Sequence, residues 1–371
     1  MDFSFSDEQQ AVSELARQIL DDKATHEIVR GFEQGDGHRH DPDLWSTMAE
    51  AGLLGMGIPE VYGGAGLSLM EVGAVLEQVG RKAAPVPALE TLGLTAPAIA
   101  EFGSDSLASS LLPGVVDGSK ILTAALMDEL APVDAPSTTA EADGDGYRVT
   151  GAKVCVPSAL LADCILVSAS TGDGTVVVAV DPSDDGCRLL PVETTAGTPD
   201  ARVELDGVAV DADHVLGASD PSAVLPWLLE RATALQCVTM VGICEASVDI
   251  TSTYITERKQ FDVPIASFQA VGQRAADAYI DTEGVRLTAW QALWRLSEGR
   301  DASMEVAAAK IWAAEAGQRV VHASVHLHGG VGVDRDYPLG RLFLAAKQLE
   351  LQLGGTTAQL RQLGRLIAAN A

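Results

Sequence analysis

The sequence has few cysteines, no long apolar run and no leader-like start, and each of these absences excludes a class of protein. Its five cysteines are odd in number and lack the spacing of a metal site: Cys155, Cys164, Cys187, Cys237 and Cys244. No uninterrupted apolar stretch reaches the about 18 residues that span a bilayer. The opening MDFSFSDEQQ is acidic and polar, unlike a signal peptide. We therefore expect a cytoplasmic protein with reduced thiols that does not associate with a membrane.

Basic residues are scarce as well. The chain has 25 Lys and Arg against 52 Asp and Glu, which gives a formal net charge of −27. Such a charge repels phosphate, so nucleic acid is excluded as a partner and an acidic, well-hydrated surface is expected. Of the 371 residues, 47% are hydrophobic, which is enough for a sizeable core in two or three layers.

The pattern of apolar residues divides the chain into three parts: residues 1–118, 119–215 and 216–371. The first part has helical periodicity and begins with Ser6 and Gln9 at the spacing of a capping box. The middle part contains β-branched runs bounded by Gly, Asp and Pro, and predicts a small, mostly antiparallel β domain that forms a barrel. The last part predicts a helical bundle, because apolar residues recur at helical spacing for about thirty residues after Pro226.

The first motif that suggests chemistry is ERKQFDVPI at 257–265, which is followed by Phe268 and Gln269. A guanidinium such as that of Arg258 forms bidentate, charge-assisted hydrogen bonds with phosphate oxygens. An arginine alone at this position is more often a cation at a helix end, so its interpretation depends on the rest of the motif.

The second motif is HLHGGVG at 326–332. Gly329 and Gly330 would let a ligand approach the backbone closely, although a Gly-Gly pair alone is also typical of a turn that ends a helix. His322 and His326 have i, i+4 spacing, and His328 follows. No nearby carboxylate or thiol pattern completes a metal site, so we expect no metal.

Both motifs resemble signatures of the acyl-CoA dehydrogenases. The first is similar to the family's E-R-x-x-F-G-x-P-I-x-x-F-Q, with Asp262 in place of Gly, and the second to Q-x-x-G-G-x-G, with His326 in place of Gln. The resemblance covers nearly the whole chain. It implies an α+β fold with an N-terminal helical domain, a middle antiparallel β-barrel domain and a C-terminal four-helix bundle.

The resemblance also implies a cofactor and the residues that face it. Family members are tetramers, and the Arg, Phe and Gly-Gly elements of one subunit reach the ADP half of an FAD that is held mainly by its neighbour. We therefore expect an FAD shared across a subunit interface. By position, the expected cofactor-binding residues are Arg258, Gln260, Phe261, Gln269, His326, Gly329 and Gly330.

The sequence departs from the family at the groups that carry out the reaction. The family's catalytic Glu, in Y-E-G-T, falls on Leu353, and a shift of one residue places it on Gly354; neither accepts a proton. Pro157 replaces the Thr of W-I-T-N-G and offers neither a hydroxyl nor an N–H. The segment 123–128 lacks the Gly-Ser turn of T-E-P-x-A-G-S-D.

Some relatives carry the base near the start of the long helix instead. That position is Ala232 here, and Glu230 lies about 200° from it around the helix, so Glu230 is expected to point elsewhere. No residue of this chain is therefore assigned as the catalytic base.

The combination of lost and retained groups resembles the non-catalytic subunit of the heteromeric α2β2 acyl-CoA dehydrogenases of actinobacterial steroid side-chain breakdown. It implies a subunit that lacks the base and contributes ADP-half contacts, while a homologous partner carries the catalytic Glu and the acyl-CoA substrate. Two alternatives stay open. One is a self-sufficient homotetramer with Glu230 as a relocated base, and the other is a flavin-free structural or regulatory homologue.

Overall fold

The computed structural model describes residues 4–35 and 37–369, and it divides into two compact units. The first unit takes the start of the chain up to Gly31, then Gly73–Ala84, and the chain from Thr233 onward. The second unit contains Phe32–Val72 and Pro85–Ala232. Because these units interleave along the chain, the division at residues 118 and 215 stays a prediction.

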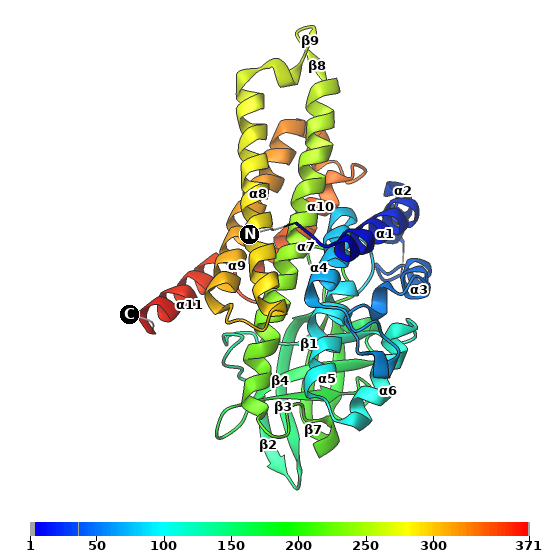
Figure 1. Ribbon diagram of the computed structural model, residues 1–371, viewed down its shortest axis with the longest axis vertical. Coiled ribbons are helices and arrows are strands. Elements are labelled where there is room, and N and C mark those ends of the chain that lie inside the picture. Colours follow the sequence, from blue (N-terminus) through cyan, green and yellow to red (C-terminus); the bar gives the residue numbers. More distant parts are fainter. Residues whose placement is uncertain (1–3, 36, 370–371) are drawn as a thin grey trace. The chain divides into compact units, whose positions relative to one another are not determined.

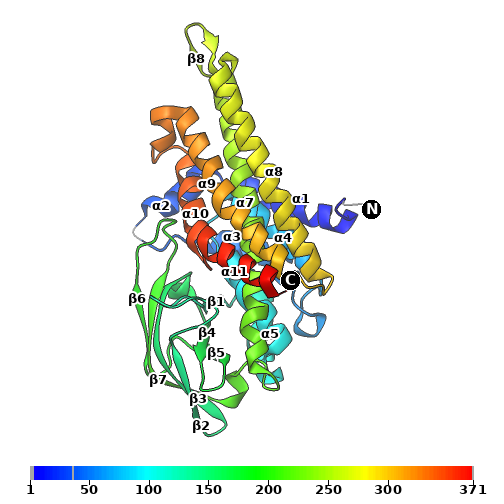
Figure 2. The same cartoon turned by 90° about the vertical axis from the view of Figure 1, so that its left-hand side faces the viewer.

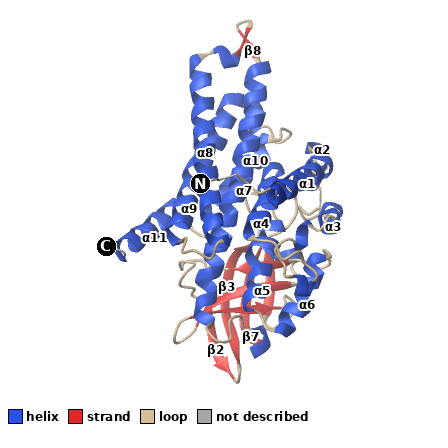
Figure 3. Ribbon diagram, in the orientation of Figure 1, coloured by secondary structure: helices blue, strands red, loops and turns tan. Residues whose placement is uncertain are grey.

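The predicted order of helical, β and helical regions is confirmed, and Figures 1 and 3 show it in the ribbon. The helices before the sheet are α1 (Asp7–Lys23), α2 (His26–Gln34), α3 (Pro42–Glu50), α4 (Leu69–Lys82), α5 (Ala96–Phe102) and α6 (Asp105–Val116). Those after it are α7 (Pro221–Glu257), α8 (Gln269–Ser297), α9 (Ser303–His328), α10 (Leu339–Leu351) and α11 (Thr356–Ala369).

The capping box predicted at the start of α1 is present. The backbone N–H of Gln9 donates to the Ser6 hydroxyl at 3.1 Å, and the backbone N–H of Ser6 donates to the Gln9 side chain at 3.0 Å. Two otherwise unsatisfied donors of the first turn are thereby paired, which fixes where the helix begins.

In the first unit, α7 packs against α4 at a distance that only small residues allow. A Cβ on Gly242 would lie 1.9 Å from the carbonyl oxygen of Glu77, and one on Gly80 would lie 2.2 Å from that of Thr239. The backbones of the two helices therefore touch. The helices α8 and α9 also pack against each other, and α10 and α11 pack against α9.

The helix α7 is long and apolar enough to span a membrane by length and composition alone. However, 78% of its most apolar window is buried inside the protein. Burial of this kind is typical of the core helix of a globular domain.

The second unit contains the sheet, whose strands are β1 (Leu122–Ala125), β2 (Thr139–Asp143), β3 (Gly146–Val156), β4 (Cys164–Ser170), β5 (Thr175–Val180), β6 (Cys187–Pro191) and β7 (Ala201–Val210). They pair in the order β1-β4-β2-β3-β7-β6, and β5 pairs with β4. The sheet is mixed, because β4 is parallel to both β1 and β2. The expected, mostly antiparallel β domain is thus present as a mixed sheet: β2-β3, β3-β7, β4-β5 and β6-β7 are antiparallel, and the described pairings follow an open path.

The interior of this unit buries an ion pair among apolar side chains. The ammonium of Lys153 lies 2.7 Å from the carboxylate of Asp128, and the two side chains are 0% and 1% exposed. Hydroxyls complete the pairing, because Lys153 also donates to Ser168 at 3.1 Å and Thr138 donates to Asp128 at 2.6 Å. A buried charge pair is tolerated when its remaining hydrogen-bonding groups are satisfied in this way.

Candidate functional site

The ERKQFDVPI motif forms a hairpin between α7 and α8. Its strands are β8 (Lys259–Gln260) and β9 (Val263–Pro264), and Figure 2 shows the hairpin where the neighbouring ends of α7 and α8 meet. Phe261 and Asp262 form the turn with φ of 55° and 64°. Two consecutive positive φ angles are typical of a type I′ turn, in which Gly or Asp is favoured. This explains why Asp262 can replace the family's Gly.

Arg258 is held by its backbone while its side chain is exposed. Its N–H donates to the carbonyl of Tyr254, and its own carbonyl accepts from the N–H of Ile265, both at 2.8 Å. Among the described residues, no carboxylate is paired with its guanidinium. An exposed, unpaired guanidinium on a fixed backbone suits an anionic group such as a pyrophosphate.

The same hairpin and its junction with α8 carry two aromatic side chains. Phe261 is 89% exposed, and its ring meets that of Phe268 edge to face with centroids 6.2 Å apart. Large exposed aromatics on a tight turn are costly unless a ligand or partner covers them. The hairpin therefore offers a cation and apolar rings together, as the ADP half of a dinucleotide would need.

The Gly329–Gly330 turn follows the end of α9. Gly329 has φ 61° and ψ −135°, a conformation that only glycine adopts readily. Gly330 has no such backbone requirement, and a Cβ added to either glycine would meet no atom of the chain within 4 Å. Neither packing nor conformation thus explains Gly330, whereas close approach of a ligand would.

The other predicted cofactor residues lie on these same two elements. Gln269 is exposed at the first turn of α8, and His326 is exposed in the last turn of α9. The side-chain amide of Gln260 donates to the neighbouring carbonyl of Lys259 at 2.8 Å. All seven predicted residues therefore belong to the hairpin, its junction with α8 or the glycine turn.

His328, considered from the sequence only as a metal ligand, lies between the end of α7 and the segment before α10. It is 4% exposed, and its ring stacks on that of Tyr254 with centroids 4.2 Å apart. The hydroxyl of Tyr337 lies 3.3 Å from Nε2 of His328. His322 instead packs edge to face on Phe343, so the three histidines do not converge. No cluster of metal-ligating residues occurs within the described chain.

Leu353, which with Gly354 is one of the two positions expected for the family's base, is buried. It is 5% exposed, has φ 55°, and its carbonyl accepts from the side-chain amide of Gln359 at 3.2 Å. Its neighbour Gln352 is also held, because its amide oxygen accepts from Gln236 at 3.3 Å. Hydrogen bonds thus fix this loop on both sides of Leu353, whose own side chain is aliphatic and cannot accept a proton.

A buried lysine supports the same loop. Lys310 is 2% exposed, and its ammonium donates to Gln236 at 3.1 Å and to the carbonyl of Leu349 at the end of α10. Burial lowers its pKa to about 8. The position of this amine at the end of α10 gives it a structural use, since it satisfies a terminal helix carbonyl.

In the second unit, the end of β3 is closed by its own hydrogen bonds. The Pro157 carbonyl accepts from the hydroxyl of Thr123 at 2.6 Å, and the N–H of Ser158 donates to the buried carboxylate of Asp200 at 3.1 Å. The register of β3 against β7 shifts between Lys153 and Val156. The Pro157 carbonyl and the Ser158 N–H are thus both paired within the chain.

Acidic groups also lie in this unit. Glu90 lies in a π-helical turn (Leu89–Thr95), and burial, together with the charge of Asp200, raises its pKa to about 7. Buried carboxyl groups close to one another disfavour further negative charge. An additional negative charge is therefore disfavoured beside Glu90.

Glu230 is partly exposed, whereas Ala232 is completely buried. The helix α7 therefore presents these two residues to different surroundings, as their spacing predicts. The role of Glu230 as a relocated base gains no support from this placement.

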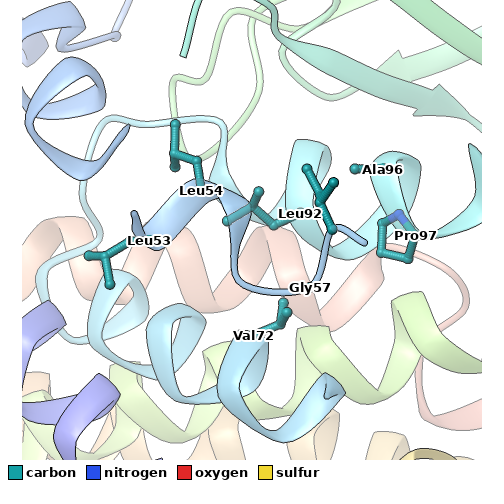
Figure 4. Close-up of a pocket in the computed structure, with 8 residues that line it drawn as sticks. Leu53, Leu54, Gly57, Val72, Leu92, Ala96 and Pro97 are labelled. Carbon is teal, nitrogen blue, oxygen red and sulfur yellow. The ribbon is translucent and has the colours of Figure 1, made fainter. Parts of the chain in front are cut away.

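One small cavity lies in the second unit and is lined only by aliphatic residues and glycine. It has about 10 Å³ of water-sized space, and its lining includes Leu53, Val72, Leu92 and Pro97 (Figure 4). A cavity of this size holds about one water and offers it no polar side chain. It is therefore a packing gap and not a catalytic pocket.

Comparison with known proteins agrees with this geometry. The profile of the acyl-CoA dehydrogenase N-terminal domain matches residues 6–119, and that of the acyl-CoA dehydrogenase C-terminal domain matches residues 223–368. The chain belongs to the acyl-CoA dehydrogenase family. These enzymes are FAD-dependent oxidoreductases.

Individual members are similar over the full length of this acyl-CoA dehydrogenase chain. Acyl-CoA dehydrogenase FadE27 of Mycobacterium tuberculosis is 42% identical, with 99% of each chain covered, and FadE28 of the same organism is 33% identical, with 98% covered. Among solved structures, the ChsE4-ChsE5 complex from Mycobacterium tuberculosis matches with a TM-score of 0.94 and 42% identity over 99% of each chain. The Tcur3481-Tcur3483 steroid ACAD matches with a TM-score of 0.93 and 43% identity over 98% of each chain.

Proposed function

We propose that this chain is the subunit without a catalytic base in a cytoplasmic, heteromeric α2β2 acyl-CoA dehydrogenase. In the family reaction a carboxylate removes the α-proton of an acyl-CoA thioester, and FAD, when bound, would supply the acceptor for the hydride of the β-carbon. The homologous partner supplies the catalytic Glu, the flavin-ring pocket and the acyl pocket. This chain contributes Arg258, Gln260, Phe261, Gln269, His326, Gly329 and Gly330 to the ADP half of the partner's FAD.

The observation that carries the proposal is the buried Leu353 on a loop that is otherwise fixed. Its carbonyl accepts a hydrogen bond from the side chain of Gln359 and it is 5% exposed, so a buried aliphatic side chain stands where the resemblance places the base. In contrast, the guanidinium of Arg258 and the space around Gly330 are open. The residues that could bind the FAD of a neighbouring subunit are therefore accessible, whereas the carboxylate that would remove the substrate's α-proton is missing from this chain.

The similar solved structures support the kind of partner. Two of them, at 42% and 43% identity, are a ChsE4-ChsE5 complex and a Tcur3481-Tcur3483 steroid ACAD. We infer a homologous acyl-CoA dehydrogenase subunit as the partner. By the same comparison we infer a steroid side-chain CoA ester as the substrate class, bound in the partner's site.

The test is a substitution at the exposed cation, made in the complex of this chain with a homologous subunit that retains the Glu. Because charge-assisted hydrogen bonds to phosphate contribute about 1.5–3 kcal/mol, Arg258→Ala should weaken FAD binding about 10- to 100-fold. Arg258→Lys should recover only part of this, since an ammonium cannot bond in bidentate fashion. The matched control is Arg361→Ala, which removes an exposed arginine of α11.

Each alternative has its own outcome in this experiment. Unchanged FAD affinity in Arg258→Ala would favour a flavin-free structural homologue. Loss of turnover by this chain alone in Glu230→Gln, with one FAD per chain, would favour a self-sufficient homotetramer. Either result contradicts the proposal.

A further inference from the structure

The side chain of His328 connects the Arg258 hairpin to the Gly329–Gly330 turn. We propose that His328 is a positioning residue, which holds these two elements at the separation that one dinucleotide needs. This inference rests on the proposed function, since it concerns the FAD that the two elements would share. His328 itself is 4% exposed and belongs to the chain's interior.

One face of the imidazole fixes the end of α7. It stacks on the ring of Tyr254 at 4.2 Å between centroids and 23° between planes. Tyr254 lies one turn before Arg258, and its carbonyl accepts the N–H of Arg258 at 2.8 Å. The Tyr254 hydroxyl in turn lies 3.4 Å from the carbonyl oxygen of His328. The ring thus contacts the residue that anchors the Arg258 backbone.

The two ring nitrogens have different partners, which defines the state of the ring. Nδ1 lies 2.8 Å from the carbonyl oxygen of Ser324, which can only accept, so Nδ1 carries the hydrogen. Nε2 is left as an acceptor for the Tyr337 hydroxyl at 3.3 Å. Burial lowers the pKa of His328, which favours this neutral form.

The same residue also fixes the glycine turn. His328 is the last residue of α9 and directly precedes Gly329. A Cβ on Gly332 would lie 3.0 Å from Cβ of His328, so the returning chain packs closely against it. The hydroxyl of Tyr337 ties the segment before α10 to the same ring. The end of α7, the end of α9 and the segment before α10 therefore meet on one imidazole, and movement of the ring would change the geometry between Arg258 and Gly330.

The experiment uses the complex with the catalytic partner and measures FAD dissociation and thermal stability for each variant. His328→Leu removes the stacking and both hydrogen bonds, and we expect FAD binding to weaken about 10-fold. His328→Phe keeps a ring and should recover part of this loss. Tyr337→Phe removes one hydroxyl and should weaken binding about 2- to 5-fold. His322→Phe, on the same helix, is the control and should bind FAD normally.

A positioning role predicts that saturating FAD restores the turnover of His328→Phe to the parent value, because His328 touches neither substrate nor cofactor. A purely structural role predicts a lower melting temperature with unchanged FAD affinity in the folded complex. Unchanged affinity in both His328→Phe and Tyr337→Phe overturns the inference, even if His328→Leu fails to assemble. If Arg258→Ala also leaves the FAD affinity unchanged, the proposed function itself is wrong. If only the His328 and Tyr337 variants leave it unchanged, the inference about His328 alone is wrong.

Discussion

The hydroxyl of Thr123 donates to the carbonyl oxygen of Pro157 at 2.6 Å, which ties β1 to the end of β3. Both residues lie where the family's flavin-contacting motifs align, and here they bond to each other. Asp200 occupies the next N–H, that of Ser158. The segment is thus stable without a ligand.

Restoring one hydroxyl should therefore not restore a flavin site. In Pro157→Thr, the new side chain offers a donor, but Thr123, Asp200 and the missing Gly-Ser turn remain as they are. We expect the variant, purified alone, to bind no more FAD than the parent chain, as measured by visible absorbance of the dialysed protein. Stoichiometric FAD in this single variant would contradict this prediction, because it would show that the β domain needs only one hydroxyl to bind FAD.

Placing a carboxylate at position 353, where the resemblance without a gap puts the family's base, should lower stability without giving activity. Leu353 is 5% exposed, so an ionised Glu in its place would be desolvated, and the ammonium of Lys310 that supports this loop is already bonded to Gln236 and to the carbonyl of Leu349. We expect Leu353→Glu to lower the free energy of unfolding by about 1–3 kcal/mol. Leu351→Glu is the matched control, because Leu351 is 64% exposed on the same segment.

Dehydrogenation of an acyl-CoA by Leu353→Glu alone, followed with an artificial electron acceptor, would contradict the account. Such activity would mean that this chain holds its own flavin ring and lacks only the base. A destabilised but inactive variant, beside a stable Leu351→Glu control, is the expected result.

Glu77 should make the stability of the protein depend on pH. Burial and the nearby Glu245 raise its pKa to about 7, and it accepts a hydrogen bond from the indole of Trp290 at 3.0 Å. Since the folded state binds this proton more tightly than the unfolded state, this group's contribution to stability is largest below about pH 4.5. It is lost as the pH rises towards 7.

Replacing the Glu77 carboxyl with an amide should remove the decrease in stability that its ionisation causes at higher pH. Glu77→Gln should therefore be more stable than the parent by on the order of 2 kcal/mol at pH 8, and close to it at pH 4.5. Urea midpoints at the two pH values, at one protein concentration, measure the difference. Glu298→Gln, at an exposed helix end, should show no such change. An equal difference at both pH values would contradict the assignment.

Much of the fold could be predicted from local signals. The capping box at Ser6 and the β-branched strands report local periodicity, which the sequence carries directly. The parallel pairing of β1 with β4 could not be predicted in this way. Alternation shows which side chains are buried, but it does not show which distant strand lies alongside or in which direction it runs.

As with the fold, local motifs predicted part of the candidate site, and long-range contacts could not be predicted. Arg258 and Gly329 belong to recognisable motifs, and both lie on the elements that the motifs predict. His328 was considered only as a metal ligand, because its contacts with Tyr254 and Tyr337 come from segments 74 and 9 residues away. The roles of Asp200 and Gln359 depend equally on long-range packing, which spacing alone does not report.

The most direct measurement of the central claim is FAD stoichiometry and turnover, for this chain alone and after coexpression with a homologous subunit that retains the catalytic Glu. The account predicts no bound FAD and no activity alone, and about one FAD per pair of chains with activity in the complex. One FAD per chain in the isolated protein, with acyl-CoA dehydrogenation, would contradict it.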